Sequence, residues 1–167
     1  MTDLKTILLI DDDDDLCEVL KEQFLMVEDF NFVEANSGVA ALNQVKNERF
    51  DLLLLDVGLP DADGRELCRL MRKQGLKSPV IMLTGHASDA EAILGLDFGA
   101  NDYVTKPFKF SVLLARIRTQ LRQHEQSEDA VLTLGPYLFR PTIKILVTEY
   151  DTKIQLTEKE TNILKFL

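Results

Sequence analysis

The chain has 167 residues, of which 46% are hydrophobic and 28% charged, and its formal net charge is −9. This composition predicts a folded core, and an acidic chain without a basic stripe is a poor nucleic-acid binder as it stands. The apolar runs are too short to span a bilayer, no secretory signal is visible, and the two cysteines have no metal-binding spacing, so we expect a cytoplasmic protein with reduced thiols and no membrane partner.

Short apolar runs alternate with amphipathic stretches along the first 123 residues. The pattern predicts strands at 7–10, 32–33, 52–55, 80–83 and 103–104 and helices at 14–26, from Ser37 onward, and at 64–74, 88–98 and 110–122. Five such units in a row indicate an α/β fold with a five-stranded parallel, doubly wound sheet. Right-handed crossovers then bring the carboxyl ends of the strands to one edge, where ligands bind.

The pattern changes after Arg122. Residues 124–131 are polar without an apolar face and are predicted to form a linker between a domain at 1–123 and a segment at 132–167. That segment predicts small antiparallel strands at 131–134, 137–139, 143–147 and 154–156. A capping box at Thr157–Glu160 then opens a last helix, in which the chain ends.

Polar residues follow the predicted strands of the first domain at one edge of the sheet: Asp11, Asp12, Asp56, Thr84 and Lys106. Three crowded carboxylates repel one another unless a cation lies among them. Oxygen-only ligands suit Mg²⁺, whereas a lysine and a hydroxyl at the same edge suit a phosphoryl group with its charged oxygens. The sequence therefore predicts a site for Mg²⁺ and a phosphoryl group.

The residues around these positions form recognisable motifs. They are Asp11-Asp12, the segment from Asp56 to Gly64, Met82-Leu83-Thr84-Gly85, and the segment from Gly99 to Phe108. With these motifs in order and at the expected spacings, residues 5–123 resemble the receiver domains of two-component response regulators, which have a flavodoxin-like fold.

That resemblance implies a phosphate acceptor and its metal site. Asp56 would be the nucleophile that takes a phosphoryl group from a sensor histidine kinase. Mg²⁺ would be bound directly by Asp12, Asp56 and the backbone carbonyl of Gly58, and through water by Asp11. The protein would catalyse only its own phosphorylation and dephosphorylation, so we expect no enzyme activity on a separate substrate.

The resemblance also implies a switch. Lys106, joined to Pro107 by a cis peptide, would pair with the phosphoryl group, Thr84 would close onto it, and Tyr103 would change its rotamer. Two simpler interpretations remain open, because a strand-end threonine can be only structural and a half-buried tyrosine packs well without switching.

A second resemblance covers the end of the chain. Residues 156–167 resemble the opening of the winged-helix effector domain of the OmpR/PhoB subfamily. The recognition helix and wing of that domain would lie beyond Leu167. The resemblance therefore implies DNA as a partner of a longer parent protein, and transcription as its target, but no specific DNA binding by residues 1–167.

The same subfamily implies a homodimer, formed on phosphorylation through the fourth helix, fifth strand and fifth helix. Asp102 and Arg116 stand where one ion pair across that interface is expected. A second pair would need charges at positions occupied by Ala92 and Val112. Either this interface is altered, or a small apolar contact replaces the ion pair.

Two other functions remain open, and one further residue has two interpretations. A receiver that signals without phosphorylation would lack phosphoryl uptake. A phosphatase of the haloacid dehalogenase type would need a general acid two residues after the nucleophile, where Gly58 stands. His86, two residues after Thr84, either orients the water that hydrolyses the acyl phosphate or is an exposed loop residue.

Overall fold

The computed structural model describes residues 4–86, 98–128, 132–134, 137–140, 145–148 and 152–165. Contacts divide the chain into two compact units, Met1–Leu121 and Arg122–Leu167. Within the described residues, no helix combines the length and the apolar character that a membrane crossing requires.

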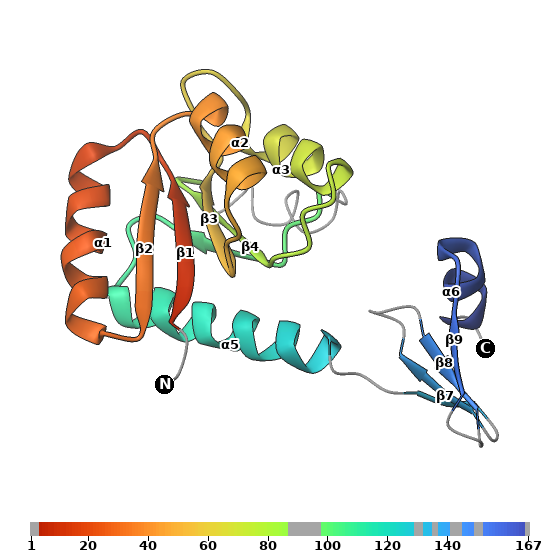
Figure 1. Cartoon of the computed structure of the whole chain (residues 1–167). Helices are drawn as coiled ribbons and strands as arrows, with labels where there is room; N and C mark the ends of the chain where they lie inside the picture. The colour runs from red at the N-terminus through yellow and green to blue at the C-terminus, as the bar shows by residue number, and fades with distance from the viewer. Residues whose placement is uncertain are drawn as a thin grey trace. The chain divides into compact units, whose positions relative to one another are not determined.

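The first unit is built on one parallel sheet (Figure 1). Its strands are β1 (Lys5–Ile10), β2 (Phe30–Ala35), β3 (Leu52–Asp56), β4 (Val80–Thr84) and β5 (Asp102–Thr105). They lie in the order β2-β1-β3-β4-β5, and every neighbouring pair is parallel. The predicted doubly wound sheet is confirmed, with the second strand longer than its apolar residues indicated.

Helices cover both faces of this sheet (Figure 1). They are α1 (Asp14–Val27), α2 (Gly38–Asn47), α3 (Gly64–Lys73) and α5 (Phe110–Glu128). One core cluster joins the sheet to α1 and α5, and the other joins it to α2 and α3. Residues 88–97 of the predicted fourth helix lie outside the described residues.

The continuous apolar runs of the central strands are explained by the helices on both faces of the sheet. Leu53 and Leu55 pack into the cluster beneath α2 and α3, whereas Leu52 and Leu54 pack on the opposite face, beneath α1 and α5. All four are fully buried. A strand buried on both faces needs no polar alternation, so β3 carries leucine up to the acid at its end.

Helix α5 corrects one prediction. The sequence predicted that the helix ends at Arg122 and that a linker follows at 124–131, but α5 continues to Glu128. Residues 123–128 contain neither glycine nor proline and are mostly good helix formers. The missing apolar face indicated only that this stretch has no apolar stripe to bury, not that it leaves the helix.

The second unit is a small antiparallel sheet with one helix. Its strands are β6 (Leu132–Leu134), β7 (Tyr137–Arg140), β8 (Ile145–Val147) and β9 (Lys153–Gln155), paired in chain order, and its helix is α6 (Glu158–Lys165). The predicted capping box is confirmed, because Thr157 Oγ1 accepts the Glu160 N–H at 3.2 Å and Glu160 Oε1 accepts the Thr157 N–H at 3.1 Å.

Candidate functional site

The central strands bring three carboxylates together. Asp11 follows β1 and Asp56 ends β3, and these strands are neighbours with Ile10 paired to Leu55. One carboxylate oxygen from each of Asp11, Asp12 and Asp56 lies within 4.8 Å of the other two. Asp11 and Asp56 are buried, whereas Asp12 is exposed and opens the cluster to solvent.

Lys106 reaches the same cluster from the end of β5. Its Nζ donates to Asp11 Oδ2 at 2.7 Å and to Asp56 Oδ1 at 3.3 Å. The lysine is placed by its own backbone, since its N–H donates to the Thr84 carbonyl at 2.7 Å. The expected cis peptide bond between Lys106 and Pro107 is present. Three carboxylates against one ammonium leave two negative charges, which fits a divalent cation held by oxygen ligands.

Burial and charge set the protonation of the two central groups. Burial and the charge of Asp11 raise the pKa of Asp56, and the ammonium of Lys106 opposes this only in part. Burial alone would lower the pKa of Lys106, but the hydrogen bond to Asp11 and the charges of both carboxylates raise it. Lys106 therefore stays positively charged, and Asp56 loses its proton less readily than an ordinary aspartate does.

A tight turn follows Asp56. The Gly64 N–H donates to the Val57 carbonyl at 2.8 Å, and Gly58 pairs with Asp63 in an isolated bridge. The Gly58 backbone lies beside the carboxylate of Asp56 and acts against the rise in the pKa of that acid. This turn places the Gly58 peptide, which sequence analysis assigned to the metal site, directly beside the acid cluster.

The two predicted switch residues lie on the neighbouring strands. Thr84 is buried at the end of β4, and its Oγ1 accepts the His86 N–H at 3.1 Å and donates to the His86 carbonyl at 3.2 Å. Tyr103 is partly buried against the cluster beneath α2 and α3. His86 itself is exposed.

The structure describes three of the four predicted interface residues. Arg116 Nη1 lies 3.2 Å from Asp102 Oδ2 within the same chain, and the Arg116 side chain is 55% exposed. Val112 is also exposed. Ala92 lies outside the described residues.

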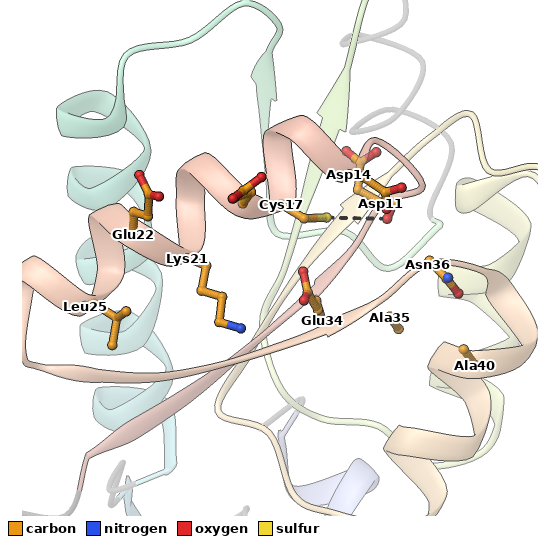
Figure 2. A pocket seen from close by; sticks show the side chains of 11 residues that line it. Asp11, Asp14, Cys17, Lys21, Glu22, Leu25, Glu34, Ala35, Asn36 and Ala40 are labelled. Carbon is orange, nitrogen blue, oxygen red and sulfur yellow. Dashed lines mark hydrogen bonds between the residues drawn. The ribbon is translucent and has the colours of Figure 1, made fainter.

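Cys17, a buried residue of α1, also touches the site. Its thiol donates to the Asp11 carbonyl at 3.6 Å, and burial raises the pKa of the thiol to about 12, so it stays a neutral donor. Figure 2 shows this contact at one side of an open pocket of about 620 Å³, which lies between α1, the end of β2 and the start of α2. Of the acid cluster, only Asp11 lines this pocket.

Two further polar residues received no role from the sequence. Asp61, in the turn after Asp56, accepts the Gly38 N–H at 2.8 Å. Arg72 on α3 donates to the Gly99 carbonyl at 2.8 Å, just before β5. A helix-start amide and an acid in a neighbouring turn are a common pair, but the sequence does not say which helix the acid will meet.

Comparison with known proteins agrees with this arrangement. The model of the response regulator receiver domain matches residues 7–118. The alkaline phosphatase synthesis transcriptional regulatory protein PhoP of Bacillus subtilis (strain 168) is 34% identical over 172 residues, covering 98% of this chain and 71% of that protein.

Two solved structures have the same fold. DrrB, an OmpR/PhoB homolog of Thermotoga maritima, has a TM-score of 0.63 and 31% identity, covering 99% of this chain and 72% of that one. TrrA of Thermotoga maritima, solved in complex with Mg²⁺-BeF, has a TM-score of 0.63 and 29% identity, covering 70% of this chain and 99% of that one. The matched motifs, the strand order and the acid cluster at the strand ends agree, and this chain belongs to the response regulator receiver family.

Proposed function

We propose that the chain is a phosphorylation switch in which Asp56 accepts a phosphoryl group from a sensor histidine kinase. The observation that carries this proposal is the meeting of Asp56, two further carboxylates and Lys106 at the ends of adjacent strands. A carboxylate oxygen of Asp56 attacks phosphorus, an O–P bond forms, and the N–P bond of the phosphohistidine breaks, leaving the electron pair on the imidazole.

The chain's own groups prepare this transfer. Lys106 already lies 3.3 Å from Asp56 and can pair with a charged phosphoryl oxygen. Asp11, Asp12, Asp56 and the carbonyl of Gly58 would hold Mg²⁺, which supplies neutralisation of the charge on the transferring group. The structure of TrrA with Mg²⁺-BeF supports this choice of metal by similarity.

The output of the switch is control of transcription. The OmpR/PhoB character of DrrB and the regulatory role in the name of PhoP support a winged-helix effector that begins near residue 132, after a receiver at 1–123. Thr84 and Tyr103 would carry the change to the surface that includes β5 and α5. A cytoplasmic location follows, because the DNA target lies there.

The proposed dimer has a specific requirement. Arg116 and Asp102 already pair within one chain. An interface that uses them must therefore exchange an internal ion pair, in which Asp102 is buried and Arg116 is exposed, for an equivalent one between chains. Val112, which is exposed beside them, would supply apolar contact.

Mass spectrometry after incubation with acetyl phosphate and Mg²⁺ tests the proposal. Wild type should gain one phosphoryl group, on Asp56, and Asp56→Asn should gain none. Acyl phosphate on Asp11 or Asp12 of the wild type would overturn the assignment. Lack of any uptake would favour a receiver that signals without phosphorylation, and turnover of a small phosphate ester would favour an enzyme.

A further inference from the structure

We infer that Asp61 is a positioning residue for the phosphorylation site, because its carboxylate ties the turn after Asp56 to the N-terminus of α2. This inference rests on the function proposed above. It gives a role in that function to a residue outside the acid cluster.

The contact is made by both oxygens of one carboxylate. Asp61 Oδ1 accepts the Gly38 N–H at 2.8 Å, and Oδ2 accepts the Val39 N–H at 3.1 Å. Amides of a first helical turn have no partner inside the helix. Ser37, the N-cap residue, satisfies only the Ala40 N–H, at 3.1 Å. Two amides of helix α2 therefore depend on a residue 22 and 23 positions further along the chain.

The turn that carries Asp61 also carries part of the site. Its base is closed by the Gly64–Val57 hydrogen bond and by the bridge between Gly58 and Asp63. At this base the Gly58 backbone lies beside the carboxylate of Asp56. Leu59, next to Gly58, anchors the near side of the turn in the core beneath α2 and α3, but a turn held only there and at its base can still tilt at its far side and carry the Gly58 peptide with it. The attachment of Asp61 to α2 removes that freedom.

Close packing at the helix start supports the same conclusion. A β-carbon built on Gly38 would lie 3.2 Å from Ala62 Cβ and 3.3 Å from Asp61 Oδ1. The turn therefore lies directly against the helix, and glycine allows this approach. The two amide hydrogen bonds also hold the pKa of Asp61 below its ordinary value, so the carboxylate is charged at neutral pH.

The competing explanation is that Asp61 only caps a helix. Ser37→Ala is the matched control, because it removes a cap from the same helix and leaves the turn untouched. Asp61→Ala removes both the capping hydrogen bonds and the link between the turn and α2. Asp61→Asn keeps one acceptor oxygen and serves if Asp61→Ala folds poorly.

Two measurements separate the explanations at a temperature where all variants are folded. The first is the Gly58 amide resonance in metal-free protein. The second is titration of that resonance with Mg²⁺, alongside the rate of phosphorylation by acetyl phosphate at each Mg²⁺ concentration. The temperature of thermal unfolding measures how much each cap stabilises the protein.

We expect both alanine variants to unfold at a lower temperature. Only Asp61→Ala should move the Gly58 resonance in the absence of metal and weaken Mg²⁺ binding, by about tenfold, the loss typical of groups that orient a metal ligand. Asp61→Asn should fall between wild type and Asp61→Ala.

Unchanged Mg²⁺ binding and an unchanged Gly58 resonance in Asp61→Ala would reduce Asp61 to a helix cap. Equal effects of Ser37→Ala would likewise overturn the inference. A wild type that binds no Mg²⁺ and takes up no phosphoryl group would instead sink the proposed function, and the metal-free Gly58 comparison would still decide the role of Asp61.

Discussion

A side chain on Gly64 has no room beside Asp56, because a β-carbon there would overlap the backbone oxygen of Asp56. Gly64 begins α3, and the turn that it closes contains Gly58. In Gly64→Ala the turn must shift away from the site. We expect a loss of about 1–3 kcal/mol in the free energy of unfolding, as for other overpacked positions, and slower phosphorylation of Asp56. Chemical denaturation and acetyl phosphate uptake measure the two effects.

Gly85 offers the control for this variant. It follows Thr84 at a neighbouring strand end, and a β-carbon built on it meets nothing within 4 Å. Gly85→Ala should change the free energy of unfolding by no more than about 0.5 kcal/mol. Equal stability of the two variants would show that the turn after Asp56 accommodates a methyl group.

The charge of Asp56 should destabilise the metal-free protein. Burial and Asp11 raise the pKa of Asp56 above its ordinary value of 3.8, so the folded state binds this proton more tightly than the unfolded chain does. The contribution of Asp56 to stability is therefore full below pH 3.8 and is lost as the pH rises through the higher folded value. Asp56→Asn, which carries no charge, should be more stable than wild type at pH 7.

Denaturation with a chelator present, from pH 3 to pH 8, tests this sign. Each unit of elevation in the pKa corresponds to about 1.4 kcal/mol at neutral pH. The advantage of Asp56→Asn should shrink as the medium becomes acidic. Added Mg²⁺ should stabilise wild type more than the variant. A less stable Asp56→Asn at pH 7 would mean that the hydrogen bond from Lys106 outweighs burial.

Arg72 should be the most costly arginine of α3 to remove. Its guanidinium donates to the carbonyls of Gly99, Leu76 and Ser78 and to Asn101 Oδ1, at 2.7–2.9 Å. Arg72→Ala leaves several part-buried oxygens without this donor, so we expect a loss of about 3 kcal/mol in the free energy of unfolding. Arg72→Lys should rescue little, because an ammonium cannot reproduce the planar fork.

Arg69, on the same helix, is the comparison. It lies 4.6 Å above the ring of Phe98 and 3.4 Å from Glu66, and its side chain is 42% exposed. Arg69→Ala should cost about 1 kcal/mol or less. Similar losses for the two arginines, measured by urea denaturation, would contradict the special role of Arg72.

The sheet and the acid cluster could be predicted because each leaves a local signal. Leu52–Leu55 form an uninterrupted apolar run, which a strand buried on both faces requires, and the polar residue after such a run has to lie at the sheet edge. The sequence therefore predicted that Asp56 and Lys106 lie together, although they are 50 positions apart in the chain.

Contacts between polar side chains and distant backbone leave no such signal. Asp61 meets Gly38 and Arg72 meets Gly99 across 23 and 27 residues, and either side chain could equally be solvated. The end of α5 was missed for another reason. A polar stretch without glycine or proline can stay helical without an apolar face to reveal it.

The lifetime of the acyl phosphate gives the last prediction, and it concerns His86. Only backbone atoms of His86 bond to the hydroxyl of Thr84, and its side chain is exposed. His86→Ala therefore leaves the hydrogen bonds around Thr84 in place and removes the imidazole alone. We expect phospho-Asp56 to decay at the wild-type rate in this variant from pH 5.5 to pH 8. An exposed imidazole is surrounded by solvent and does not hold the attacking water in place. Slower decay in His86→Ala would show instead that His86 orients that water or takes its proton.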